Sequence, residues 1–181
     1  LALRGDIPEG FSLDKLDYHH ASDLAKEISD FGGFCIGGAC YPEGHPDSAN
    51  SNEDIDNLKK KIDAGCQYLT TQMFFDNNIL YNFIYRLREK GINVPIIAGI
   101  MPVTNGKQIK RTCALSGSVL PQRFKAIVDK YGDKPEAMKQ AGIVVEKYII
   151  DKQEFHADWK YVEMVDRIIE GDFAAAKATE D

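Results

Sequence analysis

The fold of this chain is decided by residues 33–65, GFCIGGACYPEGHPDSANSNEDIDNLKKKIDAG. The stretch opens with an apolar, glycine-rich run that does not alternate with polar residues, as is typical of a strand buried on both faces. A turn with Tyr41, Glu43 and His45 follows, and residues 51–54 fit a capping box that opens a helix. This order of strand, polar turn and helix predicts an α/β protein, in which ligands bind where the strands end.

Similar units recur along the chain. Predicted strands begin near residues 34, 68 and 95, a spacing of about thirty residues, which is the length of one βαβ unit. We predict strands at residues 1–3, 34–39, 68–75 and 94–100, and helices at 14–31, 51–65, 78–90, 104–115, 121–131, 135–150 and 161–169. Strands that alternate with helices, without hairpin signals, form a parallel sheet. The predicted fold class is α/β with parallel βα repeats, either as a small open sheet or as the contiguous part of a larger barrel.

The composition limits the class of protein. A length of 181 residues predicts one domain with a substantial core. The net charge of −6 argues against a nucleic-acid partner, and no apolar run is long enough to span a membrane. No secretory signal precedes the first predicted strand, so we expect a cytoplasmic protein. The four cysteines have no C-x-x-C spacing, which favours buried, reduced thiols over a zinc site, and we predict no metal.

Polar residues follow every predicted strand. They are Arg4 and Asp6 after the first strand, Tyr41, Glu43 and His45 after the second, Gln72 and Asp76 after the third, and residues 104–108 after the fourth. Because the carboxyl ends of parallel strands lie on one side of a sheet, these clusters are expected at one rim. Their number favours a ligand site over chance turn chemistry.

One helix adds polar residues to this rim. Asp54, Asn57 and Lys61 are spaced three and four residues apart, so they form one stripe beside the apolar stripe of the same helix. Such a stripe can bind a phosphate or a ribose while the apolar stripe anchors the helix. The alternative is a capping aspartate with a solvated, charged face.

Three further features remain open from the residues alone. Gln72 would place an amide at a buried strand end, where the edge of a heterocyclic ligand can satisfy it. His45 lies in a rigid Gly-His-Pro turn, although a loop histidine is often merely exposed, and Gln108 can face either the rim or water. Residues 73–75, Met-Phe-Phe, fit a core or a pocket wall better than a cofactor motif.

Five motifs in register resemble the methylenetetrahydrofolate reductase family. They are residues 3–6 (LRGD), 41–46 (YPEGHP), 58–65 (LKKKIDAG), 71–76 (TQMFFD) and 95–102 (PIIAGIMP). The resemblance extends from residue 1 to about residue 150. It implies a (β/α)8 TIM barrel with bound FAD, which takes a hydride from NADH or NADPH and reduces 5,10-methylenetetrahydrofolate to 5-methyltetrahydrofolate. It would place the chain in one-carbon metabolism and methionine biosynthesis.

The resemblance also implies roles for individual residues. Asp6 matches a catalytic aspartate near the flavin and the pterin, where a carboxylate makes reduced flavin a stronger hydride donor. Gln72 and Gln108 match folate-binding positions. The implied cofactor contacts are Arg4, Gly5, Asp6, His20, Ala21, Tyr41, His45, Ser48, Asp54, Asn57, Lys60 and Lys61. His20 stands where the family has tyrosine, and Lys60 replaces a frequent arginine, which keeps the charge and loses the fork of donors.

The chain departs from the family pattern at both ends. The first three barrel strands, with the glutamate that serves as general acid, are not found in it, and the sequence after residue 150 does not align with the eighth strand. We therefore expect the fourth to seventh βα units, with residues 1–150 as the FAD- and folate-binding part of the barrel. Residues 151–181 are expected to form a divergent C-terminal helix and tail. The start at Leu1 rather than methionine fits a processed or partial polypeptide.

Two functions follow as hypotheses. The first is an FAD-dependent reductase of which this chain is a partial enzyme, and the second is a non-catalytic flavin- or folate-binding or interaction protein of the same fold. An unrelated small α/β protein with a phosphate site is a more remote alternative. Because an open half-barrel exposes sheet edges and apolar surface, we expect a homo-oligomer or a second chain that completes the barrel.

Overall fold

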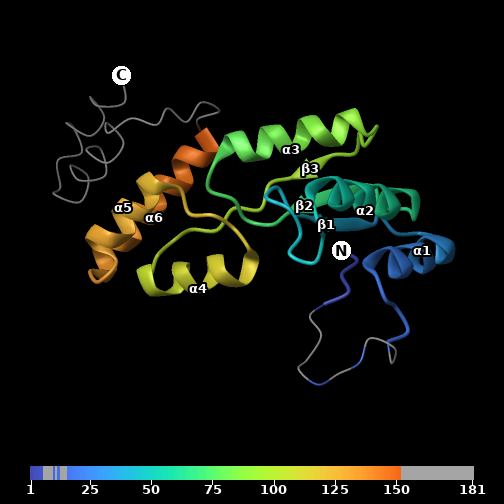
Figure 1. Cartoon of the computed structure of the whole chain (residues 1–181), viewed down its shortest axis with the longest axis horizontal. Helices are drawn as coiled ribbons and strands as arrows, with labels where there is room; N and C mark the ends of the chain where they lie inside the picture. The colour runs from blue at the N-terminus through green and yellow to red at the C-terminus, as the bar shows by residue number, and fades with distance from the viewer. Residues whose placement is uncertain (6–9, 11, 13–15, 152–181) are drawn as a thin grey trace. The chain divides into compact units, whose positions relative to one another are not determined.

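The computed structural model describes residues 1–5, 10, 12 and 16–151 (Figure 1). The chain divides into two compact units. Unit 1 comprises Leu1–Gln72 and Tyr81–Gly99, and unit 2 comprises Met73–Leu80 and the described residues from Ile100 onward. Asp6, the helix predicted at 161–169 and the predicted C-terminal tail lie outside the described residues.

Unit 1 contains a parallel sheet in the order β1-β2-β3. β1 (Gly37–Cys40) pairs with β2 (Tyr68–Thr71), and β2 pairs with β3 (Ile96–Ile97). Ala2 forms a parallel bridge to Gly38, and its backbone N–H donates to a β1 carbonyl at 2.8 Å. The predicted parallel arrangement is confirmed, and the N-terminal segment lies beside β1 as expected for a first strand.

Helices cover one face of this sheet. They are α1 (Ala21–Phe31), α2 (Ser51–Asp63) and the later turns of α3 (Asn77–Glu89). The side chains buried among α2, α3 and the strands are Cys40, Ile55, Leu58, Leu69, Phe83, Leu87 and Ile92. A second cluster contains Ala2, Ala25, Ile36 and Cys66. Successive strand side chains point to opposite faces, and the alternate residues Leu1, Leu3 and Ile97 are exposed.

Unit 2 consists mainly of helices. They are α4 (Gly106–Ser116), α5 (Gln122–Tyr131) and α6 (Pro135–Asp151). The side chains of residues 73–75 are buried in the core of this unit. The Ser118 hydroxyl donates to the carbonyl of the first of them at 2.9 Å, which satisfies a buried backbone acceptor. Residues 73–75 therefore belong to the core, as predicted.

The first predicted helix was wrong at its start. It was expected from residue 14, but α1 begins at Ala21. The Asp23 carboxylate accepts the backbone N–H groups of His19 at 3.1 Å and His20 at 2.8 Å. These bonds satisfy donors at the helix N-terminus, so the helix starts there.

The prediction of a strand at 34–39 buried on both faces was also wrong at its start. β1 begins at Gly37, and both Phe34 and Cys35 are exposed. Two consecutive glycines with positive φ, 80° and 81°, turn the chain just before this segment. The Phe34 ring then lies 6.0 Å from the Phe31 ring, so its apolar surface contacts a helix end instead of the sheet.

The other two internal strands are shorter than predicted. β2 ends at Thr71 because the residues after Gln72 enter unit 2. β3 is limited to Ile96–Ile97, and the Gly99 backbone N–H donates to the Thr71 hydroxyl at 2.8 Å instead of extending the ladder. Helices α2 to α6 begin and end within two residues of their predicted positions.

The four cysteines are free thiols. Cys40 and Cys66 are buried as predicted, and burial raises the pKa of the Cys40 thiol to about 12. Cys35 is exposed, which contradicts the expectation of buried thiols, because β1 begins only at Gly37. In the part of the chain that the structure describes, no helix has the length and hydropathy needed to cross a membrane, and no His, Cys, Asp and Glu side chains are grouped to hold a metal.

Candidate functional site

The turn after β1 holds two rings in a fixed arrangement. Tyr41 and His45 pack edge to face, with ring centroids 4.5 Å apart and an interplanar angle of 76°. Gly44 between them has a φ of 98°, a backbone conformation that favours glycine. The His45 Nδ1 atom accepts the Asp47 backbone N–H at 3.1 Å, so the neutral ring carries its hydrogen on Nε2. The turn therefore determines both the plane and the donor atom of the imidazole.

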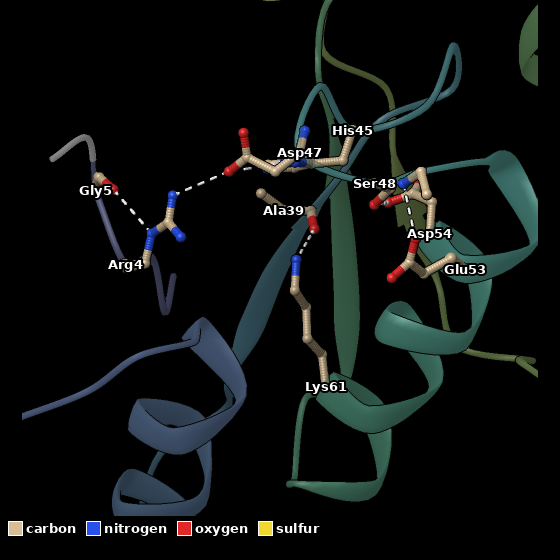
Figure 2. A network of polar contacts seen from close by, with 10 residues as sticks. Arg4, Gly5, Ala39, His45, Asp47, Ser48, Glu53, Asp54 and Lys61 are labelled. Carbon is tan, nitrogen blue, oxygen red and sulfur yellow. Dashed lines mark hydrogen bonds and ion pairs between the residues drawn. The ribbon is translucent and has the colours of Figure 1, made fainter. Parts of the chain in front are cut away.

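Arg4 reaches this turn from the N-terminal segment (Figure 2). Because Ala2 pairs with β1, the two segments end side by side, and the Arg4 Nη2 atom lies 3.3 Å from Asp47 Oδ2. Arg4 Nε also donates to the Gly5 carbonyl at 3.4 Å. The structure thus brings together polar residues that follow the N-terminal segment and β1.

Asp54 is a buried carboxylate near the start of α2. Only 5% of the residue is exposed, and the Ser48 hydroxyl donates to its Oδ1 atom at 3.5 Å. Burial raises the pKa of Asp54, while His45 (through its ring when protonated and through a backbone hydrogen bond) and the positive charge of Lys61 oppose this shift. Asp54 is therefore a carboxylate held out of water beside two basic side chains.

Asn50, and not Asp54, caps α2. Its side-chain oxygen accepts the backbone N–H groups of Asn52 and Glu53, each at 3.0 Å. The Glu53 carboxylate in turn accepts the Ala49 N–H at 2.7 Å. This pair of contacts resembles a capping box shifted by one residue from the predicted position. The interpretation of Asp54 as a helix cap is wrong, because Asn50 takes that role.

Lys61 lies on the same stripe of α2, two turns after Asp54. Its Nζ atom donates to the Ala39 carbonyl at 2.9 Å (Figure 2). Burial lowers the pKa of Lys61, while the nearby Asp54 carboxylate and the Cys40 and Cys66 thiols act in the opposite direction. A buried ammonium or carboxylate is unfavourable for folding unless partners compensate it. The alternative of a solvated, charged face is therefore wrong for these two residues.

Asn57 and Lys60 form the accessible side of the stripe. The Lys60 Nζ atom donates to the Asn57 side-chain oxygen at 2.9 Å, and the lysine is exposed. The stripe therefore has two inward residues, Asp54 and Lys61, and one residue that a ligand can reach from solvent, Asn57, with the exposed Lys60 beside it.

The remaining predicted residues lie outside the network of Figure 2. His20 and Ala21 stand at the start of α1. Gln72 follows β2, and its backbone N–H donates to a β1 carbonyl at 2.7 Å. Gln108 lies in unit 2, on the first turn of α4. Among the residues that the structure describes it is exposed, so of the two predicted orientations, rim or water, it faces water.

Asp47 is the residue of this network that the sequence prediction missed. Its carboxylate contacts Arg4, and its backbone N–H contacts His45. The one local signal is an acidic residue two positions after a histidine. Its partner Arg4 is 43 positions away in the sequence, so no local pattern indicates the pair.

The fold is an α/β arrangement of parallel βα units, with polar residues gathered where the strands end. A family model described as methylenetetrahydrofolate reductase matches residues 1–157. The chain belongs to the methylenetetrahydrofolate reductase family, and the predicted resemblance is confirmed.

Similarity to curated relatives covers part of their length. The chain is 38% identical over 143 residues to 5,10-methylenetetrahydrofolate reductase of Pectobacterium carotovorum subsp. carotovorum, which covers 78% of this chain and 47% of the relative. It is 39% identical over 150 residues to the probable methylenetetrahydrofolate reductase (NADPH) of Caenorhabditis elegans, covering 82% of this chain and 22% of that protein. The chain thus spans about half the length of the bacterial relative and a smaller share of the nematode protein.

Solved structures of similar fold include one that carries a folate in its description. It is an uncharacterized protein from Clostridium thermocellum described as binding two copies of 5-methyl-5,6,7,8-tetrahydrofolic acid. The match has a TM-score of 0.52 and 19% identity, and it covers 83% of this chain and 49% of that chain. At this identity the likeness concerns the fold alone. With the family membership, it confirms the predicted α/β fold of parallel βα repeats that belong to a (β/α)8 barrel.

Proposed function

We propose that this chain is the FAD- and folate-binding part of a reductase that converts 5,10-methylenetetrahydrofolate to 5-methyltetrahydrofolate, with NADH or NADPH as the hydride donor. The observation that carries the proposal is the placement of buried Asp54 and half-buried Lys61 beside the network of Arg4, Asp47 and His45, in a chain of this family. Charged groups held out of water destabilise the folded state, and they are typical of binding and catalytic sites.

The donor set of the site fits a flavin dinucleotide. Arg4, Lys60 and Lys61 supply the positive charge that a pyrophosphate requires, and His45 offers an Nε2–H donor. The accessible Asn57 amide can accept a hydrogen bond from a ribose hydroxyl. Asp54, which is 5% exposed, is proposed as a cofactor residue from the resemblance. When bound, FAD would supply hydride transfer between the nicotinamide and the folate. The role of this chain's residues is to bind and orient the cofactor and to exclude water from the charged groups of its site.

The substrate side of the proposal depends on three residues of the resemblance. The Gln72 amide can pair with the edge of a pterin ring. A folate role for Gln108 is proposed from the resemblance alone. Asp6 lies outside the described residues, so its catalytic role is proposed from its place in the LRGD motif. A carboxylate near the flavin would disfavour further negative charge on the reduced cofactor and so promote hydride donation.

The binding half of the proposal is tested with the purified chain and FAD. We expect the visible absorption of bound flavin and a rise in unfolding temperature, because saturation at a hundred times Kd stabilises a protein by about 2.7 kcal/mol. Lys61→Met should weaken FAD binding at least about tenfold, since it removes the positive charge of a half-buried side chain. Lys59→Met is the matched control, because Lys59 lies on the same helix and pairs with Asp63 at the surface. A protein that FAD does not stabilise, or equal losses in both variants, would refute the cofactor site.

The catalytic half is tested by two half-reactions under anaerobic conditions. NADH or NADPH should bleach the bound flavin, and 5,10-methylenetetrahydrofolate should restore its colour. Asp6→Asn should slow the restoration step while flavin binding stays largely intact. Bleaching without restoration in the unmodified chain would favour the second hypothesis, a flavin- or folate-binding protein without the complete reaction.

The assembly of the chain is a separate part of the proposal. We propose that it works as a homo-oligomer or with a second chain that completes the barrel. The exposed Leu1, Leu3 and Ile97 on the open face of the sheet support this, because apolar strand residues of a barrel are normally covered. Light scattering after size-exclusion chromatography would distinguish an oligomer from a monomer, and a stable monomer with full activity would refute both arrangements.

A further inference from the structure

Asp47 is the residue that joins the two turns of the site. Its Oδ2 atom lies 3.3 Å from Arg4 Nη2, on the segment that bridges to β1 through Ala2. Its backbone N–H donates to His45 Nδ1 at 3.1 Å. One residue therefore contacts both an arginine and a histidine that the proposed function assigns to the cofactor.

The contact with His45 determines which ring nitrogen can donate. The Asp47 carboxylate is 4.0 Å from Nδ1, farther than the backbone N–H at 3.1 Å, so Nδ1 is held as an acceptor. The edge-to-face contact with Tyr41 holds the ring plane. Nε2 is then the donor atom that the imidazole presents, and about a third of the His45 side chain is exposed to receive a ligand.

The contact with Arg4 has a different consequence. A guanidinium carries five N–H donors in a planar fork, more than the Asp47 and Gly5 oxygens take up. The Asp47 side chain is 66% exposed and that of Arg4 27% exposed, so their ion pair contributes little to folding stability. Its effect is to restrict the direction of the arginine at the strand ends.

We propose that Asp47 is a positioning residue of the flavin site. Its carboxylate orients Arg4 and its backbone N–H sets the tautomer of His45, so that both side chains present N–H donors to an anionic or carbonyl oxygen of the cofactor. This inference rests on the proposed function for the identity of the ligand, but the state of His45 can be measured without any ligand.

The carboxylate is tested by a double-mutant cycle with Arg4. Asp47→Ala should weaken FAD binding about five- to tenfold in the unmodified chain and by less than about twofold in an Arg4→Ala background. The unfolding temperature should stay unchanged. Asp63→Ala is the control, since Asp63 also forms an exposed ion pair, with Lys59, and it should leave FAD affinity unchanged. Equal losses in both backgrounds, or a fall in unfolding temperature that parallels the loss of affinity, would overturn the proposal.

The backbone contact is tested by nitrogen NMR of the histidine rings in the ligand-free chain. His45 should be the Nε2–H tautomer in the unmodified chain and in Asp47→Ala, which keeps the backbone N–H. Asp47→Pro, which lacks this donor, should shift His45 toward a mixture of tautomers. An Nδ1–H ring in the unmodified chain would overturn the inference even if FAD binds. If FAD does not bind at all, the proposed function fails and the NMR result still decides whether Asp47 sets the imidazole.

Discussion

Helix α2 has an apolar edge with Ile55 and Leu58, and a polar edge formed by the stripe of Asp54, Asn57 and Lys61. The two edges keep side chains out of water for opposite physical reasons. On the apolar edge, Ile55 and Leu58 are 2% and 1% exposed and contact Leu69 and their other neighbours in the core. Removal of such side chains from water stabilises the fold. On the polar edge, Asp54 and Lys61 are held out of water at the expense of stability. The apolar edge serves folding, and the proposed cofactor binding would explain the polar edge.

The largest expected effect comes from the apolar edge. Leu58→Ala should lower the free energy of unfolding by about 2–5 kcal/mol, because it removes buried methyl groups and leaves a cavity against a packed core. Urea unfolding followed by circular dichroism measures this loss. The FAD affinity of the molecules that remain folded should stay unchanged, as Leu58 is buried away from the polar edge. A loss below about 1 kcal/mol would mean that the core under α2 is not packed as described.

A smaller effect, with a defined pH dependence, is expected from Asp54. Because burial raises the pKa of Asp54 above its unfolded value, its contribution to stability is fully present below the unfolded pKa and is lost as the pH rises through the folded pKa. Asp54→Asn does not titrate at this position. The free energy of unfolding of the unmodified chain minus that of Asp54→Asn should therefore fall from acidic to neutral pH and then level off.

The measurement is a series of urea unfolding curves for both proteins over that pH range. Other groups titrate in both chains, so the difference isolates Asp54 and the groups coupled to it, His45 and Lys61. If the difference instead rises with pH, these neighbouring groups stabilise the carboxylate more than burial opposes it. The contrast between the two edges of α2 would then be wrong.

Helix α2 and the sheet could be predicted well from the sequence because their signals are local. Apolar spacing and turn residues indicated α2 to within two residues of its observed end, and the alternation with helices indicated parallel pairing. The start of β1 could not be predicted, since an apolar run has the same composition whether it pairs in a sheet or, like Phe34, contacts a neighbouring ring. Only tertiary structure distinguishes these cases.

In the candidate site, too, local features could be predicted from the sequence and tertiary contacts could not. The spacing of Asp54 and Lys61 placed them on one stripe, but it did not show that both point inward. Their burial depends on the position of β1, and the Ala39 carbonyl that accepts from Lys61 is 22 positions away in the sequence. Asp47 was missed because its role depends on Arg4, which is still farther away. Contacts between distant segments carry no signature in a local pattern.

The smallest expected effect on stability sharpens the comparison most, because it concerns the residue next to Leu58. Asn57→Ala removes an accessible contact with Lys60 on the same helix, which is worth about 0.2–0.5 kcal/mol. Alanine also favours the helix, so the net change in the free energy of unfolding should be close to zero. FAD affinity should nevertheless fall, as the amide lies on the polar edge.

Parallel urea unfolding and FAD titration of Asn57→Ala and Leu58→Ala would then give opposite results for adjacent residues. If Asn57→Ala leaves FAD affinity unchanged, the accessible part of the polar edge has no role in binding, and the site is confined to the inward residues Asp54 and Lys61.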